Sequence, residues 1–244
     1  MGARRGIHFF FLSMVMLFSC MGHNMRSDAN SQSLENRFVF YECSAQQLIM
    51  KWKDAEGNIL GSLGNFKSAV EKEGRQLKFA MNGGMYLADQ SPQGLYIENG
   101  QILKSLNTKT GSANFYWQPN GVFYVNGMNQ AAVCKTENFL DPKGVKYATQ
   151  SGPMLVIDGN IHPGFKEGSE HINIRNGVGI LPSGNVIMAI STEEVTLYDF
   201  AKFFKDKGCQ NALYLDGYIS RAYGPSEGLD DEGGDFGVMI GVVE

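Results

Sequence analysis

Asp216 is the residue whose type and position most strongly indicate chemistry in this 244-residue sequence. It follows the apolar segment 212–215 (ALYL), which is typical of a buried strand. A carboxylate at a partly buried sheet edge is energetically costly unless it is paired or functional. Arg175 precedes a glycine-containing segment and is its natural charge partner. An arginine at such a turn can also grip a phosphate through two parallel hydrogen bonds.

Three more turns place glycines beside a polar side chain. One follows a predicted strand over 78–81, where two glycines would let the backbone approach a ligand closely. A second offers a serine hydroxyl at a sharp turn, and a third follows Asp216 itself. Each turn, taken alone, also fits an ordinary loop, because Asn-Gly, Ser-Gly and Asp-Gly are common turn formers. The candidate residues in these turns and beside Arg175 are Asn82, Gly83, Gly84, Ser151, Gly152, Asn176, Gly217, Ser220 and Arg221.

Signals for a metal site are weak. His162 and His171, with Glu167 and Glu170 between them, could ligate a metal, but the two histidines stand nine positions apart in a glycine-containing loop. The acidic stretch 230–235 lacks the ligand spacing of a calcium-binding hand and is typical of a solvated surface. We therefore predict neither a metal nor a cofactor.

Short strands joined by tight turns dominate the pattern after residue 37. Asn-Gly and Asp-Gly pairs accept the positive φ angles that tight hairpin turns require. They predict three hairpins, formed by segments 96–98 and 101–103, 115–117 and 122–125, and 154–157 and 160–161. Further strands are predicted over 38–43, 47–52, 78–81, 212–215 and 238–243.

Two helices accompany these strands. The clearer one covers 196–207, where Thr196 can cap the N-terminus before an apolar face of helical spacing. Asn65 is the predicted cap of a shorter helix that runs to about Glu73. No linker divides the sequence after residue 37. The fold class predicted is therefore α+β, a single domain of largely antiparallel or mixed sheet with hairpins and a few helices.

The first 36 residues are predicted to stand apart from this domain. Arg4 and Arg5 precede an apolar run too short to span a bilayer, which indicates a signal peptide over 1–19. The run ends in a lipoprotein-type box, in which Cys20 would become the lipidated first residue. An ordinary cleaved signal with a coincidental cysteine is the alternative. Residues 20–36 suit a flexible tether, so we expect export to the periplasm or outer surface of a bacterium, with a lipid anchor as the sole membrane attachment.

The charge balance argues against a partner made of nucleic acid. The formal net charge is −4, and it becomes −6 when Arg4 and Arg5 leave with the signal peptide. Proteins that bind nucleic acid are normally basic. Cys43, Cys134 and Cys209 are too far apart for a CxxC motif, and the sequence does not choose which pair, if any, would form a disulfide in an oxidising compartment.

The motifs NGGMY, QSGPML, RNGVG and ALYLDGYISRAYGP, in this order, resemble those of the phosphodiester glycosidase family, in particular its bacterial exported branch. The resemblance covers about residues 37–244 and implies an α+β catalytic domain that hydrolyses sugar-1-phosphodiesters. Tyr218 and Ile219 stand where the family motif has glycines, and a tyrosine there would narrow or re-line the pocket. The motif positions carried over are Asn82, Gly83, Gly84, Ser151, Gly152, Pro153, Arg175, Leu215, Asp216, Gly217 and Ser220.

Several of the candidates can be given hypothetical roles in such a reaction. Asp216 would activate water or attack the anomeric carbon, as the carboxylates of glycosidases do. Arg175 would grip the phosphate, with Arg221 as a second cation. The backbone N–H groups of residues 83–84 could donate to the same phosphate. The side chains expected to orient sugar or phosphate oxygens are those of Asn82, Ser151 and Ser220, and the last of these is also a candidate nucleophile.

Other readings stay open. Hydrolysis by two carboxylates would need a second acid near Asp216, for which Asp89 and Glu98 are candidates. A non-catalytic envelope lipoprotein could bind glycan or sugar-phosphate polymers through exposed aromatic residues such as Trp52 and Trp117. A metal-dependent phosphodiesterase would use His162 or Asp216 as a ligand. A glycan-binding lipoprotein would bind without releasing product, which distinguishes it from the enzyme. A metal-dependent phosphodiesterase would lose its activity in a chelator.

Overall fold

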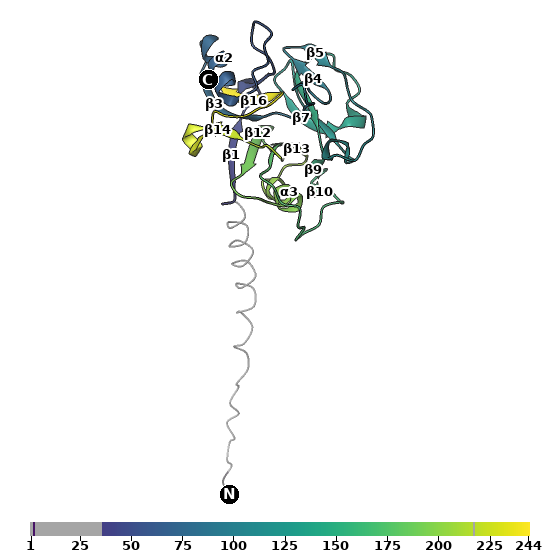
Figure 1. Cartoon of the computed structure of the whole chain (residues 1–244). Coiled ribbons are helices and arrows are strands. Elements are labelled where there is room, and N and C mark those ends of the chain that lie inside the picture. The colour runs from purple at the N-terminus through teal and green to yellow at the C-terminus, as the bar shows by residue number, and fades with distance from the viewer. Residues whose placement is uncertain (1, 3–35, 217) are drawn as a thin grey trace.

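The computed structural model describes residue 2, residues 36–216 and residues 218–244 (Figure 1). The predicted signal peptide, Cys20 and nearly all of the predicted tether lie outside the described residues. The described part of the chain forms three sheets and two helices, which confirms the prediction of a single α+β domain. None of its helices is long and apolar enough to cross a membrane.

All strand pairs in the three sheets are antiparallel. In spatial order, the first sheet contains β1 (Phe38–Cys43), β12 (Val186–Ser191), β11 (Asn176–Ile180), β13 (Ala212–Asp216), β9 (Met154–Ile157) and β10 (Asn160–Ile161). The second contains β15 (Leu229–Asp230), β14 (Ala222–Gly224), β3 (Leu77–Asn82), β16 (Met239–Val243) and β2 (Leu48–Lys51). The third contains β5 (Gln101–Lys104), β4 (Tyr96–Glu98), β8 (Val145–Ser151), β6 (Gly121–Asn126) and β7 (Ala131–Lys135).

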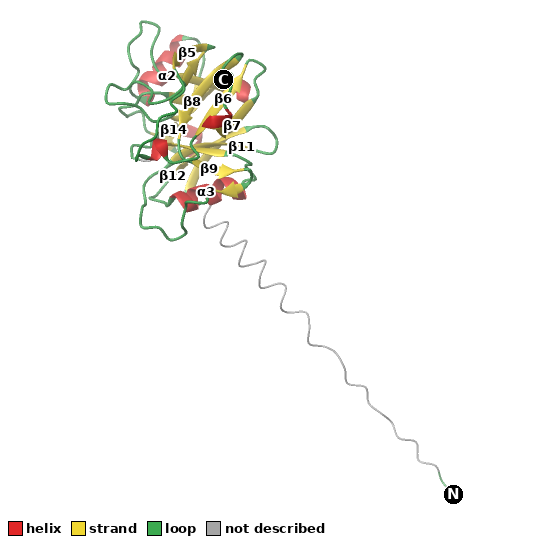
Figure 2. Ribbon diagram, turned by 90° about the vertical axis from the view of Figure 1, so that its right-hand side faces the viewer, coloured by secondary structure: helices red, strands yellow, loops and turns green. Residues whose placement is uncertain are grey.

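The helices α2 (Leu63–Lys72) and α3 (Leu197–Asp206) lie at opposite ends of the molecule in both views (Figures 1 and 2). The Thr196 hydroxyl accepts the Asp199 N–H at 3.0 Å, so the predicted cap of α3 is confirmed. The predicted cap of α2 is wrong. The capping residue is Ser62, whose hydroxyl accepts the N–H of Asn65 at 3.2 Å. The helix therefore begins at Leu63.

Two of the three predicted hairpins are present. The turns between β4 and β5 and between β9 and β10 have positive φ angles at Asn99 and Asp158, both 49°. The hairpin predicted around Asn120 is wrong, because residues Asn114–Tyr116 form a 3₁₀ turn and β6 pairs with β7 and β8. The Asn120 amide donates to the Phe115 carbonyl at 2.8 Å, which holds the aromatic segment in that turn.

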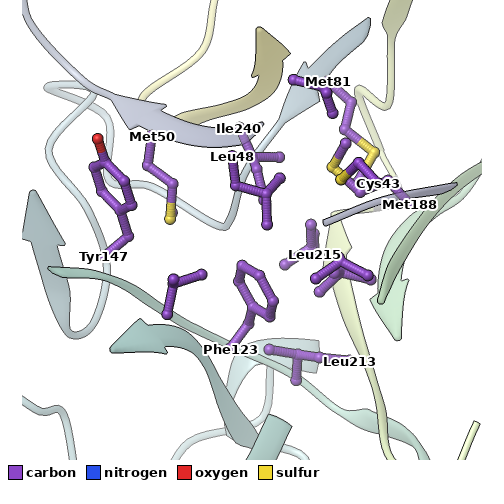
Figure 3. Close-up of a cluster of buried hydrophobic side chains, with 14 of the residues drawn as sticks. Cys43, Leu48, Met50, Met81, Phe123, Tyr147, Met188, Leu213, Leu215 and Ile240 are labelled. Carbon is purple, nitrogen blue, oxygen red and sulfur yellow. The ribbon is translucent and has the colours of Figure 1, made fainter. Parts of the chain in front are cut away.

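The largest core cluster joins all three sheets. Figure 3 shows side chains from different sheets pointing toward one another, with Leu48 and Ile240 above Phe123 and Leu213. Phe123 comes from the third sheet, Leu213 from the first and Ile240 from the second, and each of the three is fully buried. Burial of this shared apolar surface holds the sheets against each other, and it fixes the ends of β3, β8, β11 and β13 in one region.

Truncation of the central aromatic residue tests this account of the core. Phe123→Ala removes a ring that is 0% exposed, so we expect the free energy of unfolding to fall by about 3–5 kcal/mol. Ile102→Ala is the control, because Ile102 is 54% exposed on an edge strand and its loss should cost less than about 0.5 kcal/mol. Urea denaturation measures both. Equal losses for the two variants would contradict the placement of Phe123 at the junction.

Candidate active site

One buried amide, that of Asn176, connects the first and second sheets. Its Nδ2 donates to the Asn82 carbonyl at 2.7 Å and to the Asn82 Oδ1 at 3.0 Å. Its Oδ1 accepts the Asp216 N–H at 3.0 Å and the Ser220 hydroxyl at 3.3 Å. Asn176 and Asn82 are both 0% exposed. The structure therefore brings together four of the predicted site residues around one side chain.

The turn after β13 holds the Asp216 carboxylate in place. The Ser220 hydroxyl donates to the Asp216 carbonyl at 2.6 Å, and the Tyr218 N–H donates to the Asp216 Oδ1 at 3.2 Å. Asp216 is 9% exposed, so the carboxyl lies at the buried end of its strand. Gly217 lies outside the described residues. Tyr218, which replaces a family glycine, is 92% exposed and projects to the surface.

The Asn82-Gly83-Gly84 turn combines an unused donor with close packing. The Asn82 Oδ1 also accepts the Arg221 N–H at 3.1 Å, whereas its Nδ2 is buried without a hydrogen-bond partner among the described residues. A Cβ on Gly84 would lie 2.6 Å from the Thr149 hydroxyl, so only glycine fits there. The Gly83 N–H donates to the Val238 carbonyl at 2.8 Å, which leaves that group unavailable to a phosphate.

The Ser151-Gly152 turn joins the first and third sheets. The Ser151 hydroxyl is fully buried and donates to the Leu215 carbonyl at 2.9 Å, one residue before Asp216. A Cβ on Gly152 would lie 2.6 Å from the Asn120 Cβ. In this arrangement the turn positions β13, and direct contact of Ser151 with a substrate stays a prediction.

The Arg175 guanidinium is enclosed by protein acceptors. Its Nε donates to the Val195 carbonyl at 2.7 Å, its Nη2 to the His171 carbonyl at 2.9 Å and its Nη1 to the Tyr214 hydroxyl at 2.8 Å. The residue is 2% exposed. Three of its five N–H groups are thereby used inside the protein, and a grip on phosphate stays a prediction that rests on the other two.

Tyr214 is a site residue that the sequence analysis missed. Burial, together with the negative charge of Asp216, raises the pKa of its hydroxyl to about 12 although the Arg175 cation lowers it. Tyr214 precedes Asp216 by two positions on β13, so both side chains leave the same face of the sheet. The sequence signal for Tyr214 was its position two residues before the candidate acid on a predicted strand, because alternate residues of a strand share one face. The Tyr214 hydroxyl accepts from the Arg175 cation, and the charge of Asp216 acts on its pKa.

The loop before β16 carries Asp235, which contacts Tyr86 and Gln90. Burial raises the pKa of Tyr86 to about 12, and the negative charges of Asp216 and Asp235 add to that shift. The Tyr86 hydroxyl donates to the Asp235 carbonyl oxygen, and the Gln90 amide donates to its carboxylate at 2.5 Å. Asp235 belongs to the acidic stretch expected to be only a solvated surface. Asp235 is exposed, as expected for that stretch, and its printed contacts are with Gln90 and Tyr86.

The two acids predicted as partners of Asp216 have other surroundings. Asp89 is fully exposed and accepts the Ser91 hydroxyl at 2.6 Å, which lowers its pKa. Glu98 accepts the Tyr96 hydroxyl at 2.6 Å and the Trp52 N–H at 3.2 Å, and burial raises its pKa. The guanidinium of Arg221, the other predicted cation, pairs with Asp231 at 2.7 Å.

His162 uses both ring nitrogens within the protein. Its Nε2 lies 3.0 Å from the Gln118 carbonyl and its Nδ1 accepts the Gly164 N–H at 3.0 Å, an arrangement that suits the neutral ring. Burial lowers its pKa. Within residues 36–216 and 218–244, no cluster of three or more His, Cys, Asp or Glu side chains could hold a metal ion. The three cysteines left open above, Cys43, Cys134 and Cys209, are free thiols.

The segment 224–228 (GPSEG) matches the GxSxG pattern of hydrolase nucleophile elbows. An elbow requires a strand followed by a helix. Here Pro225–Glu227 is a 3₁₀ turn between the short strands β14 and β15, and Ser226 is exposed. Its geometry is therefore that of a surface turn.

Comparison with known proteins identifies the family to which this chain belongs. A family model described as phosphodiester glycosidase matches residues 75–228. The uncharacterized protein YigE of Escherichia coli (strain K12) is 40% identical over 179 residues, which are 73% of this chain and 70% of that protein. The chain belongs to the phosphodiester glycosidase family.

Solved structures share the fold at low sequence identity. The catalytic domain of zebrafish N-acetylglucosamine-1-phosphodiester alpha-N-acetylglucosaminidase, auto-inhibited by its pro-peptide, aligns with a TM-score of 0.60 and 14% identity, over 85% of this chain and 83% of that one. A hypothetical protein from Synechocystis aligns with a TM-score of 0.50 and 15% identity, over 84% of this chain and 59% of that one.

Removal of the Asn176 amide tests its structural role. Asn176→Ala leaves the Asp216 N–H and the Asn82 carbonyl without their buried partner, so we expect the free energy of unfolding to fall by about 3 kcal/mol or more. Asn185→Ala is the matched control, because its amide bonds Glu42 on the surface and should cost less than about 1 kcal/mol. A loss for Asn176→Ala no larger than that of the control, in urea denaturation, would contradict the assignment.

Proposed function

We propose that this protein is an exported hydrolase that cleaves glycosyl phosphodiester bonds at the Asp216 site. Family membership supports the reaction class. The observation that carries the proposal is that Asn176 bonds both the Asp216 N–H and Asn82, whose buried Nδ2 has no partner among the described residues. A buried donor without a partner is rare in proteins, and a substrate oxygen would satisfy it.

The chemistry of the substrate fits a site of this composition. In a sugar-1-phosphodiester the group that leaves is a phosphate monoester, which needs little help from an acid. What the site must supply is a nucleophile or base for the anomeric carbon and donors for the oxygens that gain charge. In the proposal Asp216 is that nucleophile or base. The C–O bond breaks, its electron pair leaves with the phosphate, and water supplies the new sugar hydroxyl.

Other residues are proposed to position these groups. The Arg175 cation holds the Tyr214 hydroxyl at 2.8 Å beside the Asp216 strand and contributes positive charge for the phosphate. Tyr86 stays protonated near neutral pH, because burial raises its pKa to about 12, and it is proposed to hold the loop that carries Asp235 through the hydrogen bond from its hydroxyl to the Asp235 carbonyl oxygen. Asp235 is the proposed second carboxylate of the pair.

Substitution of Asp216 tests the proposal. Asp216→Asn keeps the shape of the side chain and an oxygen for the Tyr218 N–H. With the full-length protein we expect its kcat on a sugar-1-phosphodiester to fall about a thousandfold or more, while the free energy of unfolding changes by less than about 1 kcal/mol. Asp230→Asn is the matched control, because Asp230 is an exposed acid on β15, in the second sheet, and it should keep wild-type turnover.

The assay also decides between reaction classes. In ¹⁸O-labelled water the label should enter the sugar and not the phosphate, and a chelator should leave the rate unchanged. Label in the phosphate, or inactivation by the chelator, would favour a metal-dependent phosphodiesterase. Binding of sugar phosphates by the wild-type protein without any product would instead identify a glycan-binding lipoprotein and overturn the enzymatic proposal.

Export with a lipid anchor on Cys20 is part of the same proposal and rests on the signal-like pattern of residues 1–19. We expect radiolabelled palmitate to enter the wild-type protein expressed in bacteria and not the Cys20→Ser variant. Incorporation into both, or into neither, would contradict the anchor. Cys209→Ser is the control, because Cys209 is buried and should not affect labelling.

A further inference from the structure

A cavity of about 380 Å³ lies between the loop of residues 164–171 and the start of α3. Its size falls within the range of small-molecule pockets, roughly 300–1,000 Å³. Trp117, Phe165 and Tyr198 supply aromatic lining, and Lys166, Glu170 and His171 supply polar groups. From sequence, Trp117 was named only as an aromatic of the glycan-binding alternative, and Glu170 and His171 only as weak metal-ligand candidates; no cavity residue was assigned to the Asp216 site.

Trp117 is held rigidly at this cavity. Its indole packs edge-to-face against His162 at 5.5 Å and against Phe165 at 5.4 Å between ring centroids. A Cβ on Gly164 would lie 3.0 Å from the Trp117 Cζ2, so the backbone there also supports the ring. The next carbonyl along the chain, that of Gln118, bonds the His162 ring. The indole nevertheless remains 38% exposed, which leaves part of a fixed aromatic surface open to a ligand.

Polar groups around the aromatic surface are available to a ligand. Lys166 and Glu170 are exposed, and neither side chain forms a hydrogen bond or ion pair with any residue that the structure describes. One is a donor and the other an acceptor, and their charges offset each other. An uncharged ring with hydroxyls on its edge and C–H groups on its face matches this combination, because the ring can stack on the indole while its hydroxyls bond both groups.

The cavity is connected to the site by Arg175. The His171 carbonyl, on a residue that lines the cavity, accepts the Arg175 Nη2 at 2.9 Å, and the Val195 carbonyl, two residues before Leu197 of the lining, accepts its Nε at 2.7 Å. The same guanidinium bonds Tyr214 on the strand that carries Asp216. A rigid cation therefore fixes the cavity wall relative to the strand of the proposed catalytic residue.

From this geometry we infer that the Trp117 cavity binds a neutral pyranose ring of the substrate's glycan part, away from the phosphodiester that is cleaved. The assignment of this ring to the substrate rests on the proposed function. The cavity is thus a specificity site, in which Trp117 is the stacking surface and Lys166 and Glu170 select hydroxyl orientation.

Tryptophan fluorescence tests the inference without turnover. The chain has two tryptophans, so Trp52→Phe in the full-length protein leaves Trp117 as the single reporter. The probes are the methyl pyranosides of glucose, galactose and N-acetylglucosamine and a trisaccharide of each. We expect a saturable change in Trp117 emission with at least one probe. No saturable change with any of them overturns the inference.

Calorimetric titration of variants locates the binding. Trp117→Ala should weaken the affinity for the best probe about tenfold or more, whereas Trp117→Phe, which keeps an aromatic ring, should restore most of it. Lys166→Ala should also weaken binding, and Lys143→Ala is its matched control on an exposed lysine elsewhere. Affinity that survives Trp117→Ala overturns the inference.

Turnover separates this inference from the proposed function. Binding that depends on Trp117 without hydrolysis of any phosphodiester supports the cavity and overturns the enzymatic proposal. Hydrolysis whose kcat/KM on an oligosaccharide phosphodiester is unchanged by Trp117→Ala supports the enzyme and overturns the cavity. Where both hold, Trp117→Ala should raise KM with little change in kcat, because the ring contacts a part of the substrate remote from the reacting carbon.

Discussion

The buried side chain of Asn176 donates its hydrogen bonds to the second sheet and accepts others from the first. Its Nδ2 reaches the end of β3 and its Oδ1 holds the start of the turn after β13. An amide is suited to this position because it is both donor and acceptor without a net charge, so it can be buried at modest cost once all its groups are paired. The apolar core holds the sheets together, but that attraction is not directional. The Asn176 hydrogen bonds are directional, and they set where the Asp216 backbone sits relative to Asn82.

Arg175, the residue before Asn176, is also buried, and burial of its charge costs more free energy than burial of a neutral amide. A buried guanidinium is tolerated only where its donors are paired, and here two backbone carbonyls and the Tyr214 hydroxyl accept from it. The consequence is that one cation fixes the loop before β11, the segment before α3 and the face of β13. Positioning of this kind matters for catalysis because a displacement of about 1 Å can reduce a rate by about a hundredfold.

Local pattern was sufficient for most of the fold. The apolar run 212–215, the Asn99 and Asp158 turns and the Thr196 cap each predicted an element that is present, because each depends on residues close in sequence. The failed hairpin around Asn120 depended on a hydrogen bond from that side chain to Phe115, which no residue pattern expresses. How the strands are ordered into three sheets was likewise beyond the sequence, since antiparallel pairing between distant strands is set by the shared core.

In the candidate site, too, local sequence predicted which residues take part but not how their side chains are oriented. Asn82, Asn176, Asp216 and Ser220 were found from strand ends and turns, and the structure brings them together. Strand ends and turns in the sequence do not predict the direction of each side chain, because that direction depends on contacts with residues distant in sequence. The Ser151 hydroxyl, for example, bonds the Leu215 carbonyl, and Tyr86 bonds the Asp235 carbonyl oxygen from a loop far away in sequence.

The composition of the cluster is explained by the proposed leaving group. A departing phosphate monoester is a stable anion, so the site has little need for a histidine that changes its charge near neutral pH. In the proposed reaction, a carboxylate, buried amides and tyrosines kept protonated by burial would supply charges and dipoles that need no reorganisation as charge moves toward the phosphate. His162 is then free to serve as a neutral packing partner of Trp117, with a pKa lowered by burial. In the proposed function and the proposed sugar site, the imidazole therefore acts only through its packing against Trp117.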